Sequence, residues 1–259
     1  MTDIDSQQPI DAPVETVEAA PPHLIVLFGA TGDLARRKLI PALLHLIRHG
    51  LLTECRIVGV SQDDMDDSAF QDFARKACVE FCRDFSFDRD WDQFGPLLSY
   101  VPVTAGPEAL AATVAKQEVE LGGSPQRLHY MSVPPFAAEA VLRTIDRAGL
   151  VERARVILEK PFGTDLQSAR LLNEHLHKVF REDQIFRIDH FLGKEAAQNI
   201  LAFRFANGLF EPIWNRNFID HVQIDVPETL GLGRRAAFYE QTGAFRDMVV
   251  THLFQILAF

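Results

Sequence analysis

Long apolar runs are missing from this sequence. No hydrophobic segment approaches the roughly 18 residues that a membrane span requires, so the composition is not that of a membrane protein. The first 22 residues contain five acidic residues and four prolines, but no lysine, no arginine and no apolar segment. This composition is typical of a disordered tail, and it lacks the basic start and apolar centre of a secretion signal. We therefore expect a cytoplasmic protein.

Basic residues and cysteines are also scarce. The chain has 26 Lys and Arg against 36 Asp and Glu, and this balance argues against nucleic acid as a partner, because nucleic acids bind basic surfaces. Three cysteines, Cys55, Cys78 and Cys82, cannot all pair with one another. Cys78 and Cys82 have the i,i+4 spacing of neighbours on one helix face, and no second His/Cys cluster accompanies them. We predict reduced thiols and no metal site.

From residue 24 onward, short apolar segments alternate with helical patterns. Pro41 predicts a kink in the first helix, and Gly50 predicts the end of that helix. Six strands separated by helices favour an α/β fold, a Rossmann-type doubly wound parallel sheet with helices on both faces. The strands are predicted within 24–28, 56–60, 97–103, 127–133, 154–163 and 184–188, and the helices within 33–50, a long region after the second strand, 108–121, 136–148 and 165–180.

After residue 190 the pattern changes. A helix is predicted near 193–206, a strand over 220–226 and a last helix from Gly243. We expect a disordered tail over 1–22, a dinucleotide-binding domain over 23–188, and the start of a β+α substrate domain over 189–259. The sequence ends in LFQILAF without a cap or a polar tail, and such an uncovered apolar segment predicts that the second domain is truncated.

A glycine-containing turn follows the first strand. In GATGDLA, Gly29 and Gly32 would let the backbone approach a pyrophosphate at the start of a helix, although the spacing meets the dinucleotide fingerprint only in part. A tight turn without a ligand is the alternative. The residue at the end of the second strand normally decides between the two nicotinamide cofactors: an acid favours the free ribose hydroxyl of NAD, and an arginine favours the 2′-phosphate of NADP. Here Gln62 is followed by two aspartates, and neither rule is cleanly satisfied.

The segment RIDHFLGKE places reactive side chains directly after a strand of the parallel sheet. Asp189 and His190 follow the carboxyl end of that strand, where open α/β sheets bind ligands. His190 and Lys194 would share one face at the start of a helix, an arrangement suited to a phosphate. An exposed, capped helix start explains the same residues equally well.

Two further segments carry candidate site residues. In EKPFG, Lys160 ends another strand and precedes Pro161, and a cis Lys160–Pro161 bond is our hypothesis. In AFRDMVVTHLF, Asp247 and His252 lie on a helical pattern. Because Met248 and His252 are four residues apart, the pattern alone favours a hydrogen-bonded core histidine.

The motifs GATGDLARRKLIPAL, YMSVPP, EKPFG, RIDHFLGKE and DMVVTHLFQ, taken together in this order, closely resemble the glucose-6-phosphate dehydrogenase family over residues 24–259. The resemblance implies oxidation of glucose 6-phosphate to 6-phosphogluconolactone in the oxidative pentose phosphate pathway, with NADP as cofactor and NAD in some members. It also implies a homo-oligomer for full-length members, which are nearly twice as long. The portion beyond residue 259 would supply most of the antiparallel sheet and the usual dimer interface.

The resemblance also implies roles for individual residues. His252 would be the general base, and Asp189 its partner. The substrate would contact Lys160, His190, Lys194, Glu228 and Asp247. The cofactor would contact Gly29, Ala30, Thr31, Gly32, Asp33, Leu34, Ala35, Arg36, Gln62, Tyr130 and Lys160.

These residue types suit the chemistry independently of the resemblance. Oxidation of a hemiacetal removes a hydroxyl proton while a hydride leaves, so a base with a near-neutral pKa is required, and a carboxylate beside a histidine orients the ring and stabilises its charge. Two alternatives stay open. One is a sugar oxidoreductase of the glucose-fructose type, whose members share the EKP turn, and the other is a truncated, inactive NADP-binding homologue.

Overall fold

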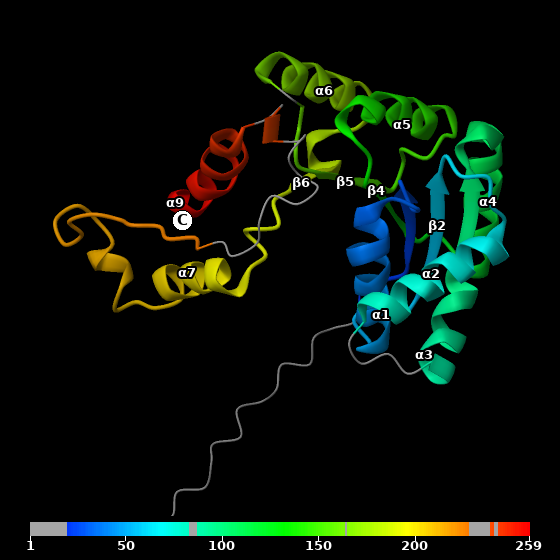
Figure 1. The fold of residues 1–259 in the computed structure, drawn as a ribbon, viewed down its shortest axis with the longest axis horizontal. Coiled ribbons are helices and arrows are strands. Elements are labelled where there is room, and N and C mark those ends of the chain that lie inside the picture. The colour runs from blue at the N-terminus through cyan, green and yellow to red at the C-terminus, as the bar shows by residue number, and fades with distance from the viewer. Residues whose placement is uncertain (1–19, 83–86, 164, 228–238, 241–242) are drawn as a thin grey trace, which may run out of the picture.

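The structure is a computed structural model that describes residues 20–259 except 83–86, 164, 228–238 and 241–242 (Figure 1). Its main feature is one parallel sheet of six strands in the order β3-β2-β1-β4-β5-β6. The predicted α/β fold is therefore confirmed. The strands are β1 (His23–Phe28), β2 (Cys55–Ser61), β3 (Leu98–Pro102), β4 (Gln126–Met131), β5 (Ala154–Glu159) and β6 (Ile185–Ile188).

The strand order reverses between β1 and β4. Both neighbours pair with β1 in parallel register, Phe28 opposite Val60 on β2 and opposite Met131 on β4. The connections after β1 and β4 leave on opposite sides of this point, which opens a crevice at the carboxyl ends of the strands. A ligand of such a sheet is therefore expected above Phe28.

Helices cover both faces of the sheet. Along β1, Leu24, Val26 and Phe28 pack on one face while Ile25 and Leu27 pack on the other, as the two-residue period of a strand requires. The first face is covered by α4 (Gly106–Glu120), α5 (Pro135–Arg147) and α6 (Leu166–Val179). The second is covered by α1 (Ile40–Arg48), α2 (Asp67–Phe81) and α3 (Phe87–Phe94).

The helix predicted over 33–50 is divided in two. Ala35–Leu39 form a π-helical segment, and α1 starts at Ile40 with Pro41 in its first turn. Proline has no backbone N–H to donate into the preceding turn, so the hydrogen-bond pattern changes at this point. The helix ends as predicted before Gly50, whose φ of +69° is a left-handed conformation.

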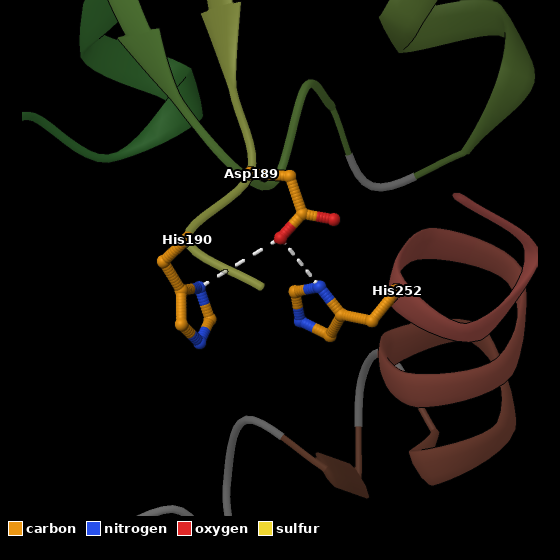
Figure 2. Close-up of side chains that lie close together, drawn as sticks. All are labelled: Asp189, His190 and His252. Carbon is orange, nitrogen blue, oxygen red and sulfur yellow. Dashed lines mark ion pairs between the residues drawn. The ribbon is translucent and has the colours of Figure 1, made fainter. Parts of the chain in front are cut away.

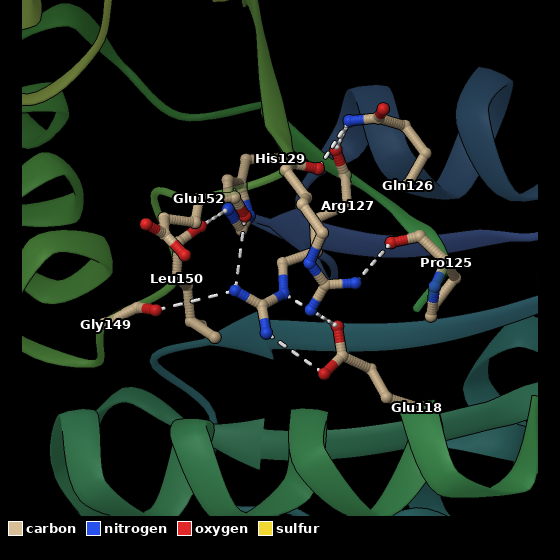
Figure 3. Close-up of polar contacts among 9 residues, drawn as sticks. Glu118, Pro125, Gln126, Arg127, His129, Gly149, Leu150 and Glu152 are labelled. Atoms are coloured by element: carbon tan, nitrogen blue, oxygen red, sulfur yellow. Dashed lines mark hydrogen bonds and ion pairs between the residues drawn. The ribbon is translucent and has the colours of Figure 1, made fainter. Parts of the chain in front are cut away.

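A buried ionic network lies at the amino ends of the strands, which is the end of the sheet opposite the crevice (Figure 3). Arg127, at the start of β4, donates from Nε to Glu118 Oε1 at 2.8 Å and from Nη2 to Oε2 at 3.0 Å. Its Nη1 also donates to the carbonyl of Glu152, just before β5. The guanidinium thus joins α4 to the starts of two strands, and its charge is fully paired, so this network is structural.

The part after β6 lies beside the β6 and α6 end of the sheet (Figure 1). It contains α7 (Glu195–Phe205), a π-helical segment η7 (Phe245–Leu253) and α9 (Phe254–Ala258), besides short 3₁₀ turns. The strand predicted over 220–226 is wrong, since these residues have no regular structure. A strand needs a partner to complete its hydrogen bonds, and none of the described residues after Ile188 forms one.

Candidate active site

The turn after β1 brings the backbone against β4. Gly29 has φ +77°, and its N–H donates to the carbonyl of Val60 at 2.8 Å. A Cβ atom at Gly29 would lie 2.1 Å from the carbonyl oxygen of Ser132, so only glycine fits. The turn closes with Gly32 N–H donating to the Gly29 carbonyl at 2.9 Å. Sequence and packing therefore agree on a tight βα turn at this point.

A cavity of about 450 Å³ opens above this turn. Its walls come from the carboxyl ends of β1 to β4 and from the first turns of α5, which is the crevice where the strand order reverses. The floor is apolar, with Val101, Leu110 and Val133, and the rim carries Thr31 and Asp63. An apolar slot with a few polar groups at its rim suits the adenosine half of a dinucleotide.

The predicted cofactor residues do not all lie at the cavity. Those that line the cavity are Gly29, Thr31, Gly32 and Gln62. Ala30 and Ala35 are buried in the core, while Asp33 and Leu34 are exposed. Arg36 pairs with Glu80 on α2, away from the cavity lining. Tyr130 does not line the cavity either, and its hydroxyl donates to Glu159 Oε1 at 2.6 Å. Burial first, and then Glu159, raise the pKa of this hydroxyl, which keeps it protonated.

The second cluster of candidate residues lies where β6 ends (Figure 2). His252, on η7, places Nδ1 2.6 Å from Oδ1 of Asp189, although the direction departs from that of an aligned hydrogen bond. Asp189 Oδ1 also accepts the N–H of Phe191 at 3.0 Å. The His252 residue is 1% exposed and the Asp189 side chain 12% exposed. Two residues far apart in the sequence thus form a buried acid–imidazole pair.

Aromatic contacts hold the imidazole ring of His252. The Phe191 ring stacks on it with centroids 4.1 Å apart and an interplanar angle of 16°. The His190 ring meets it edge-on at 4.9 Å. Stacking on one face and an edge contact restrict rotation of the ring, so its two nitrogens keep fixed directions.

Lys160 completes the cluster. The Lys160–Pro161 bond is cis, as hypothesised from EKPFG. Lys160 Nζ donates to His252 Nε2 at 2.5 Å and to Asp247 Oδ1 at 2.7 Å. Because an ammonium only donates, Nε2 must carry a lone pair, and a neutral ring then has its proton on Nδ1, the nitrogen nearer Asp189. The surroundings therefore assign the neutral tautomer whose basic nitrogen is Nε2.

Asp247 is the counter-ion of Lys160. Its Oδ2 accepts the hydroxyl of Tyr239 at 3.1 Å. Burial raises the pKa of this carboxyl, but the hydrogen bond and charge of Lys160 lower it more, and the net pKa lies below its ordinary value. Asp247 is thus ionised and holds the ammonium beside Nε2.

His190 and Lys194 do not share a helix face, contrary to the prediction. Helix α7 begins at Glu195, and His190 to Gly193 form turns. The Asp189 carboxylate captures the N–H of Phe191, and such a local bond competes with helix formation. Lys194 Nζ lies 3.8 Å above the Phe191 ring, and the His190 side chain is 64% exposed. Burial, followed by the nearby His252, lowers the pKa of His190.

Other parts of the prediction meet the structure in different ways. Glu228 lies outside the described residues. Asp189, His190 and His252 bring ligand atoms within 4.8 Å of one another, the geometry of a cation site, but the ammonium of Lys160 at the other ring nitrogen opposes a cation. Sequence reasoning missed Tyr239 and the Phe191 stack; no motif marks the tyrosine, whereas the phenylalanine lies inside RIDHFLGKE.

A parallel sheet with a glycine turn and a cavity at its switch point defines a Rossmann-type dinucleotide-binding protein, here with an Asp–His–Lys cluster beside the sheet. The model of the glucose-6-phosphate dehydrogenase NAD binding domain matches residues 26–199, and that of the family's C-terminal domain matches residues 201–259. The chain belongs to the glucose-6-phosphate dehydrogenase family.

Relatives and solved structures agree with this assignment. Glucose-6-phosphate 1-dehydrogenase 2 of Mycobacterium tuberculosis is 42% identical over 92% of this chain and 48% of its own length. The glucose-6-phosphate 1-dehydrogenase of Rhizobium meliloti is 44% identical over 92% and 49%. The crystal structure of the Mycobacterium avium glucose-6-phosphate 1-dehydrogenase has a TM-score of 0.80 at 39% identity, covering 92% of this chain and 52% of that one.

A second solved structure, a glucose-6-phosphate dehydrogenase in complex with glucose 6-phosphate, has a TM-score of 0.81 at 33% identity and covers 93% of this chain and 52% of its own. The chain thus spans about half the length of the relatives it matches. Among the described residues, no helix has the length and apolarity of a membrane span.

Proposed function

We propose that this chain is the N-terminal part of a glucose-6-phosphate 1-dehydrogenase, which oxidises glucose 6-phosphate to 6-phosphoglucono-1,5-lactone. The observation that carries the proposal is the His252 Nδ1 to Asp189 Oδ1 contact of 2.6 Å, with the Lys160 ammonium at the other ring nitrogen. Residues 23–188 would form the dinucleotide domain and 189–259 the start of the substrate domain. The protein would act in the cytoplasm, and oligomerisation would depend on the rest of the sequence.

His252 would remove the proton from the C1 hydroxyl of the sugar. In the assigned tautomer Nε2 is the free base, and proton transfer to it produces an imidazolium. Asp189 lies beside Nδ1, so its negative charge would stabilise that cation and hold the ring in place.

Lys160 would act on the sugar oxygen. Its Nζ donates to the one lone pair of Nε2, so a sugar hydroxyl would take the place of the ammonium at that lone pair and leave the ammonium beside the hydroxyl oxygen. A positive charge at that point lowers the cost of removing the proton. Asp247 would hold the ammonium in position and contact the sugar with its remaining acceptor capacity.

A nicotinamide dinucleotide would supply the hydride acceptor. The glycine turn fits such a ligand, since a Cβ atom at Gly29 would collide with the neighbouring backbone and the cavity opens directly above it. Gly29, Thr31, Gly32 and Gln62 would hold it. The family resemblance implies NADP, with NAD as the alternative. His190, Lys194 and Glu228 would contact the phosphorylated sugar.

The test is a spectrophotometric assay of the purified chain with glucose 6-phosphate and either NADP or NAD. Growth of the reduced-nicotinamide absorbance band is the expected result. Turnover of glucose at least as fast as of its 6-phosphate would favour a sugar oxidoreductase of the glucose-fructose type. Absence of turnover together with measurable dinucleotide binding would favour an inactive nucleotide-binding homologue.

A further inference from the structure

The end of β2 forms one wall of the cavity above the glycine turn. Ser61, Gln62 and Asp63 all line it. In doubly wound sheets the adenosine ribose lies at this place. A side chain there distinguishes a ribose with a free 2′-hydroxyl from a ribose with a 2′-phosphate. The charges on this wall therefore decide which nicotinamide dinucleotide enters.

Asp63 is held at this position by both its main chain and its side chain. The Thr31 hydroxyl donates to Asp63 Oδ2 and also contacts the Ser61 hydroxyl at 2.7 Å. The hydroxyl of Tyr100 donates to the Asp63 carbonyl at 2.8 Å. Asp63 forms no ion pair with any described residue. A carboxylate with an uncompensated charge is thus fixed at the rim of the cavity.

The nearby arginines, Arg36 and Arg37, pair with acidic groups that do not line the cavity. Arg36 pairs with Glu80, and Arg37 lies 3.8 Å from Asp33. Both guanidinium groups also lie 5.5 Å from the centre of the Phe81 ring, on the side of α2. Among the described residues that line the cavity, Asp63 is the only charged one. A ribose 2′-phosphate would therefore meet a negative charge and no positive one.

We propose that Asp63 makes this chain select NAD over NADP. The carboxylate accepts a hydrogen bond from the free 2′-hydroxyl of NAD, and it repels the 2′-phosphate of NADP, since like charges placed together at a binding surface disfavour binding. This inference rests on the proposed function, because it assumes that the cavity takes a nicotinamide dinucleotide. It narrows that function to one of the two cofactors.

The experiment is direct titration of the purified chain with NAD and with NADP by isothermal calorimetry, which needs no turnover. We expect NAD to bind at least about tenfold more tightly than NADP. Asp63→Asn keeps the size of the side chain and removes its charge, so the ratio of the two Kd values should fall by about tenfold. Gln62→Arg should tighten NADP about tenfold. Asp64→Asn is the matched control; it removes the next acid, which does not line the cavity, and should leave the ratio unchanged.

The outcomes separate the two proposals. Tighter binding of NADP than of NAD by the unmodified chain would overturn the selection of NAD while leaving the dehydrogenase proposal in place. An unchanged ratio in Asp63→Asn would overturn the role of this carboxylate, provided that thermal unfolding shows the variant folded. Failure of the folded chain to bind either dinucleotide would reject the proposed function, and this inference with it.

Discussion

His252 Nδ1 lies 2.6 Å from Asp189 Oδ1, although one residue follows a strand of the parallel sheet and the other lies on the π-helical segment Phe245–Leu253. The contact joins the two parts of the chain at the point where the proposed reaction takes place. Lys160, from a third segment, approaches the opposite nitrogen of the same ring.

Replacement of His252 by asparagine should reduce kcat by about 10²- to 10⁴-fold, because the variant lacks the base that accepts the sugar proton. Dinucleotide affinity should hold, since the ring is not part of the cavity lining. Steady-state kinetics and calorimetric titration measure the two quantities. His221→Asn is the matched control, because His221 is exposed and its ion pair among the described residues is with the neighbouring Asp220. Near-normal turnover of His252→Asn would refute the base assignment.

Lys160 and Asp247 should be energetically coupled. Lys160→Met leaves a carboxylate that is 12% exposed without its cation, and should lower the free energy of unfolding by about 2–3 kcal/mol. Asp247→Asn in the same chain should restore part of that loss, because the unpaired charge is gone. Urea unfolding of the four members of the double-mutant cycle measures the coupling. Strictly additive effects would show that the pair contributes nothing.

The same pair predicts a change at acid pH. The folded pKa of Asp247 is lowered from its ordinary value of 3.8, so its contribution to stability is present above that pH and disappears as pH falls through the folded value. In Lys160→Met the largest cause of the lowering is absent, so the stability that the chain loses through Asp247 on acidification should become smaller. The pH dependence of urea unfolding below about pH 5 compares the two chains.

Gly29 should tolerate alanine far less well than Gly50 does. Both glycines have positive φ, +77° and +69°, but a Cβ at Gly29 would overlap the Ser132 carbonyl, whereas a Cβ at Gly50 meets nothing within 4 Å. Gly50→Ala should cost about 1 kcal/mol of stability, and Gly29→Ala about 3 kcal/mol or more. Gly29→Ala should also abolish dinucleotide binding. Equal costs in chemical unfolding would argue against the close approach.

His129 should make the protein acid-sensitive. It is fully buried on β4, where Nε2 donates to the Leu150 carbonyl at 2.8 Å and Nδ1 has no partner among the described residues. Burial lowers its pKa from 6.5 to about 4. Between these values the unfolded chain binds the additional proton, so stability falls as pH decreases, by about 2 kcal/mol between pH 6.5 and 5.

His129→Phe should flatten that part of the pH profile, since phenylalanine does not titrate and the neighbouring rings of Phe28 and Phe180 already surround the site. Urea unfolding at several pH values measures the slope. His23→Phe is a control, because this histidine lies outside the two buried clusters of the core. An unchanged slope in His129→Phe would show that another group is responsible.

Local signals were sufficient for the sheet. Each strand was indicated by a short apolar segment, because helices cover both faces of a parallel sheet and its strands are therefore buried on both sides. The helices were indicated by the period of their apolar residues. Predictions failed where an element depends on contacts with another segment. The segment 220–226 alternates as a strand does, but finds no neighbouring strand among the described residues, and the turn at Asp189 displaced the helix start to Glu195.

The site was visible in part. RIDHFLGKE and EKPFG identified Asp189 and Lys160 because both follow strands, and strand ends meet at one edge of a parallel sheet. For His252, periodicity favoured a core histidine, and the residue is indeed 1% exposed and stacked on Phe191. Burial and a candidate catalytic position coincide there, and no pattern within one helix distinguishes them.

The order of residues alone was enough to indicate the strands, the helices and the glycine turn, because the period of apolar residues and the turn glycines are patterns between residues close together in the chain. Only the packed structure showed that His252 lies between Asp189 and Lys160 and that Tyr239 reaches Asp247. It also showed that Asp63 is the one charged residue among the described residues that line the cavity. The contacts of His252 with Asp189 and Lys160 join segments distant in sequence, and their geometry is set by how helices and sheet pack, which local patterns do not encode.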